Sequence, residues 1–174
     1  FEGIEISEAQ KEEVSFFVIP VQDKIDIFEG IEIPEAERKE IIFLEKYYGN
    51  NPSVRIIYHE KNRKQGASRN TGLDVANGKY IFFLDSDDWL GEGALVHLAS
   101  VAEKYNAEIV ACGVKRFWED GKIEPYHAHA FACVGGREAL YHFAETRIGS
   151  IVWNKLYLRD FIEKNNLRFI SPYW

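Results

Sequence analysis

Three aspartates directly follow an apolar segment in the middle of the chain. Residues 80–84 read YIFFL and run into Asp85, Ser86, Asp87 and Asp88. A continuous apolar run of this length is typical of a strand that is buried on both faces. Because Asp85 and Asp87 are two residues apart, an extended backbone points both carboxylates to the same side. Two hard oxygen ligands on one side suit Mg²⁺ or Mn²⁺, which takes its remaining ligands from water and substrate phosphates.

The same residues have a structural alternative. Ser86, Asp87 or Asp88 could cap a helix that begins after them, because short polar side chains accept hydrogen bonds from the free N–H groups of a first helical turn. A calcium-binding loop fits poorly, since Leu90 stands where such a loop requires glycine.

A second candidate segment lies upstream and reads GASRNTG over residues 66–72. It follows a predicted strand at 54–58 and opens a predicted helix at 67–76. The basic residues in and before it are Lys61, Arg63, Lys64 and Arg69. A helix N-terminus with cations nearby suits a diphosphate or a nucleotide. Its spacing matches neither a Walker loop nor a dinucleotide fingerprint, so an ordinary capped turn is the alternative.

Strands and helices are predicted to alternate through residue 105. The expected strands cover 14–21, 54–58 and 80–84, and the expected helices cover 34–48, 67–76 and 93–105. This alternation favours a parallel sheet wrapped by helices, in which ligands bind at the carboxyl ends of the strands. Beyond residue 105 we expect a strand at 109–118, a hairpin turn at Asp120-Gly121, a partner strand at 123–131, and helices at 137–146 and 158–165.

The central block GASRNTGLDVANGKYIFFLDSDDWL resembles the signature of family-2 glycosyltransferases of the GT-A fold. The family's parts occur here in the family's order: Ile19-Pro20-Val21, Arg69 to Gly72, Ala76 to Tyr80, and Leu84 to Asp88. Residues 152–157 (VWNKLY) resemble a segment common in bacterial members. The resemblance covers 14–21 and about 54–170. It implies a GT-A-like, Rossmann-like α/β fold, with a mostly parallel sheet flanked by helices and a C-terminal hairpin and helices.

The resemblance also implies an activity. An inverting, metal-dependent transferase of the hexosyl or N-acetylhexosaminyl class would move a sugar from a nucleotide-sugar donor, by default a UDP-sugar, to a saccharide or lipid-linked acceptor. Such enzymes serve polysaccharide biosynthesis. A divalent metal neutralises the leaving nucleoside diphosphate, while a carboxylate base assists the acceptor hydroxyl.

The matched motifs imply roles for individual residues. Asp87 would bind the Mn²⁺ or Mg²⁺ ion that bridges the donor diphosphate, and Asp85 would contact the ribose or share the metal. Arg69 would help to hold the nucleotide, and Asn70 would lock the loop. The remaining donor-binding residues implied by the motifs are Pro20 and Val21, which would line the base pocket, and Ser86.

Two parts of the family pattern are missing from this sequence. After Val21 the chain lacks the strand that ends in an Asp-Asp-Gly-Ser-like motif, and its last residues lack the Glu-Asp pair that supplies the catalytic base. We therefore assign no base. The alternative function is a catalytically inactive, nucleotide-sugar-binding relative or scaffold. A nucleotidyltransferase is a weaker rival, because we find no glycine-rich nucleotide loop near the N-terminus.

Length and composition set the outer limits of these predictions. The chain has 174 residues, starts at Phe1 and contains no methionine. We expect one domain, with a donor-binding part at about 14–105 and an acceptor-side part at about 106–174, and we expect it to be a piece of a longer protein. The net charge is −8 over residues 1–46 and +1 over the rest, which argues against a nucleic-acid partner.

Several further features receive structural interpretations. No apolar run is long enough to cross a bilayer, so we expect a cytoplasmic protein, with peripheral association at the inner face of the membrane as an option. Cys112 and Cys133 lack metal-ligand spacing. His127 and His129 fit a polar strand face better than a metal site. We interpret Trp153 and Tyr157, at helical spacing, as core residues rather than an acceptor platform.

Overall fold

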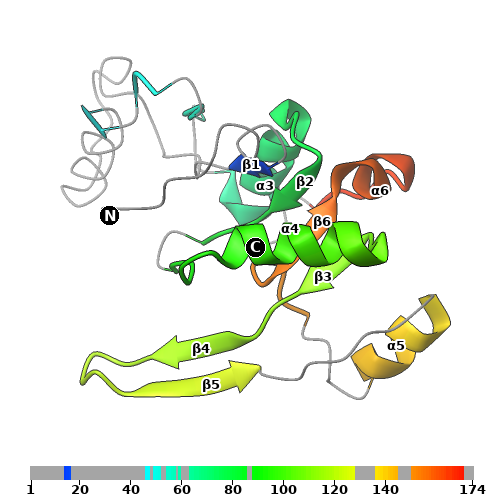
Figure 1. Ribbon diagram of the computed structural model, residues 1–174. Coiled ribbons are helices and arrows are strands. Elements are labelled where there is room, and N and C mark those ends of the chain that lie inside the picture. The colour runs from blue at the N-terminus through cyan, green and yellow to red at the C-terminus, as the bar shows by residue number, and fades with distance from the viewer. Residues whose placement is uncertain are drawn as a thin grey trace.

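The structure is a computed structural model, and it describes residues 14–16, 46–47, 49–51, 54–57, 59, 63–85, 88–127, 136–144 and 150–170. The described residues form a four-stranded sheet and a separate two-stranded hairpin (Figure 1). The order across the four-stranded sheet is β1-β2-β6-β3. Its strands are β1 (Val14–Phe16), β2 (Tyr80–Phe82), β6 (Lys155–Leu158) and β3 (Ile109–Ala111).

The strand directions explain how this sheet is built. β1 pairs with β2 in parallel, with Val14 opposite Tyr80. β6 is antiparallel to both of its neighbours, with Leu156 opposite Phe82 on one side and Val110 on the other. Three strands therefore run in one direction and β6 runs against them. The α/β class and the direction of most strands are as predicted, but the antiparallel strand in the middle was not foreseen.

The residues of β2 pack on both faces of the sheet. Tyr80 and Phe82 belong to a cluster with Leu98 and Ala102 of α4 (Ala94–Tyr105). Ile81 and Phe83 belong to a second cluster on the opposite face, with Leu73 of α3 (Lys64–Val75) and Ile162 of α6 (Arg159–Lys164). This burial on two faces confirms the prediction drawn from the continuous apolar run. It also fixes the direction in which the chain leaves β2 toward Asp85.

Helix boundaries follow local chemistry. α4 ends at Asn106, whose φ of 47° is left-handed and whose backbone N–H bonds the carbonyl of Ala102 or Glu103. This is a common way to end a helix, because asparagine tolerates the left-handed region. Next to it, the Tyr80 hydroxyl donates to Glu103 Oε1 at 2.7 Å and Lys79 pairs with the same carboxylate. These contacts tie the end of α4 to the start of β2.

Three predictions about elements were wrong. Residues 54–57 form no strand in the described chain, and residues 109–118 divide into β3 and β4 (Val114–Phe117), of which β4 pairs with β5 (Ile123–His127) in the hairpin. The segment around Trp153 and Tyr157 is not helical, because Tyr157 lies in β6 opposite Ile81. The predicted helices at 137–146 and 158–165 are confirmed as α5 (Gly136–Ala144) and α6.

Some predictions concern residues that the structure does not describe. They include Pro20, Val21, Ser86, Asp87, His129 and Cys133. Among the helices that are described, none has the length and apolar character required to cross a bilayer.

Candidate active site

An ion pair joins the two motifs that the sequence singled out. Asp85 follows β2 at its carboxyl end, and Arg69 lies in the second turn of α3. The Arg69 Nη2 atom donates to Asp85 Oδ1 at 2.7 Å. The two side chains are only 18% and 23% exposed, so the pair is shielded from bulk water on most sides. The fold therefore brings together a cation and a carboxylate that are 16 residues apart in sequence.

A backbone hydrogen bond ties Asp88 back to Asp85. The Asp88 N–H donates to the Asp85 carbonyl at 3.1 Å, the hydrogen bond that defines a four-residue turn. Leu90 then packs against the core cluster beside α4. The turn thus stands at the carboxyl edge of β2, where open α/β sheets bind ligands.

The described carboxylate at this turn is a type of ligand that suits a divalent cation. Asp85 offers a carboxylate at the strand end, and such hard oxygen ligands suit Mg²⁺ or Mn²⁺. Its charge is compensated in part by Arg69, whose guanidinium donates to Oδ1 at 2.7 Å. In the part of the chain that is described, no three metal-ligating side chains lie together. Asp87 is outside that part, so its metal-binding role stays a prediction.

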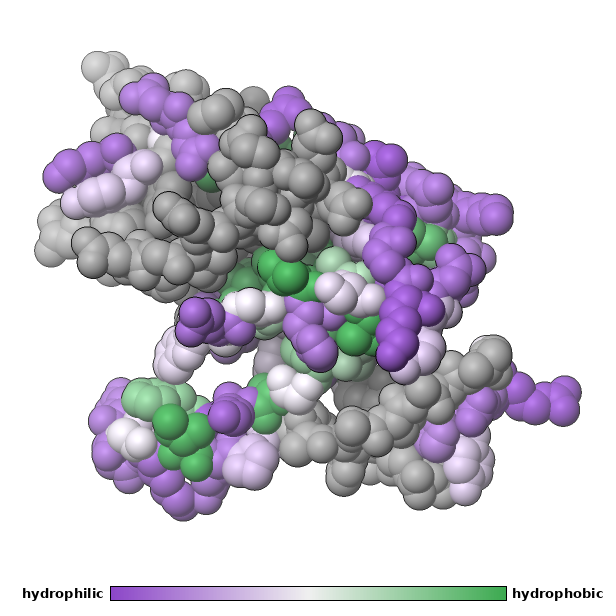
Figure 2. Space-filling model, viewed as in Figure 1, coloured by the Kyte–Doolittle hydropathy of each residue, from purple (hydrophilic) through white to green (hydrophobic). Residues whose placement is uncertain are grey.

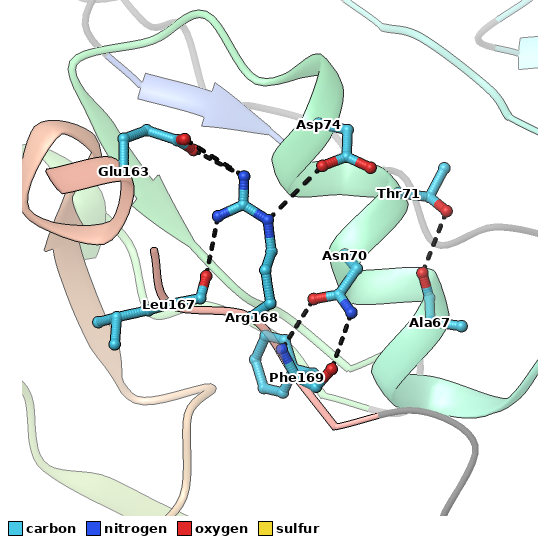
Figure 3. A network of polar contacts seen from close by, with 8 residues as sticks. All are labelled: Ala67, Asn70, Thr71, Asp74, Glu163, Leu167, Arg168 and Phe169. Carbon is cyan, nitrogen blue, oxygen red and sulfur yellow. Dashed lines mark hydrogen bonds and ion pairs between the residues drawn. The ribbon is translucent and has the colours of Figure 1, made fainter. Parts of the chain in front are cut away.

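Asn70 connects α3 to a segment near the end of the chain (Figure 3). Its Nδ2 atom donates to the carbonyl of Phe169 at 2.9 Å, and its Oδ1 atom accepts from the Phe169 N–H at 2.8 Å. Both polar groups of one peptide residue are therefore bound by one side-chain amide, 99 residues away in sequence. The sequence-based expectation was that Asn70 locks a loop, and the structure identifies the segment that it holds.

The Phe169 ring packs against the Arg69 side chain of the ion pair. It meets the ring of Phe83 edge-on, with 5.3 Å between centroids, and the Arg69 guanidinium carbon lies 5.4 Å from its centroid. Such a cation–π contact restrains the guanidinium group that binds Asp85. Phe169 is thus part of the site, although it lies far outside the recognised central block.

The start of α3 explains the first glycine of the GASRNTG segment. The helix begins at Lys64 rather than at Ala67 as predicted, so Gly66 already lies in its first turn. A Cβ atom on Gly66 would approach the carbonyl oxygen of Ile170 to 3.1 Å. The glycine therefore lets the 167–170 segment lie close against α3. The helix thus begins three residues before the predicted helix at 67–76.

The 167–170 segment has a second attachment to its surroundings. Arg168 pairs with Glu163 of α6 at 3.2 Å and with Asp74 of α3 at 3.6 Å (Figure 3). These pairs are exposed and add little stability individually, but they bridge two helices on one face of the sheet.

A buried polar network lies at the same sheet edge, on β6. Because Leu156 is opposite Phe82, the start of antiparallel β6 lies at the carboxyl end of β2. Lys155 is 6% exposed, and its Nζ atom donates to Asn154 Oδ1 at 2.7 Å and to the carbonyl of Ile151. The Asn154 amide donates in turn to the carbonyl of Cys112 at 3.1 Å.

Burial controls the titration of this network. It lowers the pKa of Lys155 and raises the pKa of the Cys112 thiol, because each charged form loses solvation. Two residues farther along β6, burial raises the pKa of Tyr157 to about 12. The thiol is therefore a poor nucleophile at neutral pH and acts as a packing residue.

The comparisons with known proteins agree with this arrangement. The family model described as glycosyl transferase family 2 matches residues 41–165. The chain belongs to glycosyl transferase family 2. It is 33% identical over 129 residues to the uncharacterized glycosyltransferase EpsJ of Bacillus subtilis, with 72% of this chain and 37% of EpsJ covered. It is 31% identical over 135 residues to the uncharacterized glycosyltransferase YibD of Escherichia coli, with 74% of this chain and 39% of YibD covered.

A solved structure of a GT-A glycosyltransferase shares the fold. The crystal structure of S. aureus TarS residues 1–349 in complex with UDP-GlcNAc superposes with a TM-score of 0.57 at 18% identity, and 76% of this chain and 36% of TarS are covered. The chain therefore spans less than two fifths of the length of these family-2 proteins. The resemblance seen in the sequence is confirmed for the family and for the GT-A-like fold.

The structure shows which parts of the site the sequence analysis missed. Arg69, Asn70 and Asp85 were predicted and lie together. Phe169 was not predicted, because an apolar residue in a polar tail carries no sign of its distant partner. Lys155 lies in the VWNKLY segment that was recognised, but its burial was unforeseen, since lysine is rarely buried.

Proposed function

We propose that this chain is part of an inverting, metal-dependent glycosyltransferase, with a donor-binding part at about 14–105 and an acceptor-side part at about 106–174. The observation that carries the proposal is the shielded ion pair of Arg69 and Asp85 at the carboxyl end of β2. The donor would be a nucleotide-diphosphate sugar of the hexosyl or N-acetylhexosaminyl type. UDP is the default nucleotide, which the UDP-GlcNAc bound by the TarS structure supports. The acceptor would be a saccharide or a lipid-linked saccharide.

The described residues would each perform a positioning task. Arg69 fixes the Asp85 carboxylate through the 2.7 Å hydrogen bond, and Asn70 and Phe169 fix Arg69. Asp85 would face the ribose or share a divalent metal with Asp87. When bound, Mn²⁺ or Mg²⁺ would neutralise the charge that develops on the leaving diphosphate.

The reaction would proceed by a single displacement. The acceptor hydroxyl would form a bond to the anomeric carbon while the bond to the diphosphate oxygen breaks, and its proton would pass to a carboxylate base. We assign no residue of this chain to that base. Pro20, Val21 and Ser86 would complete the donor site, and residues 106–174 would face the acceptor.

The experiment compares nucleotide binding with and without metal. Isothermal titration calorimetry with UDP and Mn²⁺ should show binding that disappears in Asp87→Ala, whereas Asp160→Asn, an exposed carboxylate of α6, should bind like the parent. Binding by Asp87→Ala that is as tight as in the parent would refute the site. Release of UDP from UDP-sugars by the full-length protein should follow binding. Tight UDP binding without any turnover would instead favour the catalytically inactive relative.

A further inference from the structure

Two exposed aromatic rings meet beside the turn at residues 85–88. Trp89 directly follows Asp88, and its ring contacts Phe117 of β4 with centroids 5.3 Å apart and ring planes at 71°. The two residues are 60% and 51% exposed. The rings therefore form an open corner that we call the aromatic corner. Exposed large rings cost free energy in water, so a pair that is held open next to a site calls for an explanation.

The backbone holds Trp89 in this position from both sides. On one side, the Asp88 N–H is bonded to the Asp85 carbonyl at 3.1 Å. On the other side, Leu90 packs into the core beside α4. The backbone on both sides of Trp89 is therefore anchored, and the exposed ring itself contacts Phe117. Anchoring of a binding residue before a ligand arrives reduces the ordering that binding must pay for.

The two faces of the hairpin differ in chemistry. Side chains alternate along β4, so Phe117 shares a face with Lys115 and with its cross-strand partner Ile123, both exposed. The other face carries Arg116, whose guanidinium carbon lies 4.2 Å from the Tyr126 ring centroid and 5.7 Å from that of Trp118. The aromatic rings of that face therefore lie within cation–π distance of Arg116, although both remain exposed. Figure 2 shows apolar side chains gathered on the hairpin toward its turn.

We propose that the aromatic corner binds a pyranose ring of a saccharide acceptor, with Trp89 as the stacking platform. This inference rests on the proposed function. A pyranose has apolar C–H faces and a rim of hydroxyl groups, so it fits an exposed indole face with an ammonium donor nearby, here Lys115. The position also fits, because an acceptor must place its hydroxyl next to a donor held at the 85–88 turn, and Trp89 is four residues from Asp85.

Saturation-transfer-difference NMR tests the proposal on the protein with UDP and the diamagnetic ion Mg²⁺ present. The probes are methyl β-D-glucopyranoside, methyl β-D-galactopyranoside, methyl N-acetyl-β-D-glucosaminide and octyl β-D-glucopyranoside. We expect saturation of the ring C–H protons of at least one probe. The affinity for that probe should fall about tenfold or more in Trp89→Ala and should be largely kept in Trp89→Phe. Trp118→Ala, on the opposite face of the hairpin, is the matched control and should bind like the parent.

Each outcome separates this inference from the proposed function. Absence of saturation on UDP protons would refute the proposed donor site whatever the sugars do. UDP binding together with sugar signals that are unchanged in Trp89→Ala, or with no sugar signal from any probe, would refute the aromatic corner alone. Saturation confined to the alkyl protons of the octyl glycoside would refute it in favour of a lipid-binding surface.

Discussion

The side-chain amide of Asn70 binds the backbone N–H and the backbone carbonyl of Phe169 at the same time, at 2.8 and 2.9 Å. This arrangement is the pairing that a neighbouring β-strand would provide, made instead by one side chain on a helix. It holds the Phe169 ring against Phe83 and under Arg69. The end of the described chain is therefore connected to Asp85 through the contact of Phe169 with Arg69 and the ion pair of Arg69 with Asp85.

Replacing Asn70 should therefore loosen the site as well as the fold. We expect Asn70→Ala to lower the free energy of unfolding by about 2 kcal/mol, because two partly buried backbone groups lose their partner. Asn70→Asp should lose a similar amount, since its carboxylate would face the Phe169 carbonyl. Urea denaturation measures both. Asn165→Ala, which removes an exposed hydrogen bond to the carbonyl of Phe161, should cost less than about 0.5 kcal/mol. Equal losses in the two alanine variants would contradict the coupling.

The ion pair of Arg69 and Asp85 should show measurable coupling. A double-mutant cycle with Arg69→Met and Asp85→Asn is expected to give about 1 kcal/mol or more, because the pair is largely shielded and its hydrogen bond is charge-assisted. The Lys122–Glu124 pair on the hairpin is 59% and 46% exposed and serves as the reference, with an expected coupling below about 0.5 kcal/mol. A coupling for Arg69 and Asp85 no larger than the reference would show that the contact is not maintained in solution.

Gly66 should resist a substitution that stabilises most helices. In an unobstructed helix, glycine to alanine gains up to about 1 kcal/mol. Gly66→Ala should gain nothing or lose stability, since the new Cβ would meet the Ile170 carbonyl oxygen at 3.1 Å. In the Asn70→Ala background, where the 167–170 segment is released, the same change should become stabilising. Gly136→Ala at the start of α5, where nothing lies within 4 Å, is the control for the substitution itself. Chemical denaturation of the four variants decides the sign.

Alkaline pH should reveal the burial of Tyr157. Its pKa is raised from 10.0 to about 12, so the folded protein keeps the phenol protonated where the unfolded chain releases the proton. The contribution of the protonated Tyr157 phenol to the free energy of unfolding is complete below pH 10. It is lost as the pH rises toward 12, which lowers the free energy of unfolding by at most roughly 2 to 3 kcal/mol. Tyr157→Phe should therefore show a flatter fall in unfolding free energy between pH 9 and 12 than the parent. Tyr105→Phe, at an exposed position, should follow the parent curve.

Local patterns in the sequence predicted β2 and α4, because each depends on residues close together in the chain. A fully apolar run specifies a strand buried on two faces, and the residues that pack on Ile81 and Phe82 bear this out. Arg69 and Asp85 were each identified through the family pattern, but their ion pair was not predicted. The pairing of β6 and the position of Phe169 could not be predicted from the sequence, because they depend on partners about 75 and 99 residues distant. The sequence KLYL of β6 also fits a helix as well as a strand.

The central position of β6 has a consequence for synthesis on the ribosome. A nascent chain that ends before residue 155 can pair β1 with β2, but the other edge of β2 then has no neighbour and the 85–88 turn lacks the support of Phe169. An open strand edge of apolar residues is a template for association with other chains. Within the described part of the chain, the sheet closes only after β6 has emerged, and a chaperone that binds extended apolar segments would be expected to act before that point.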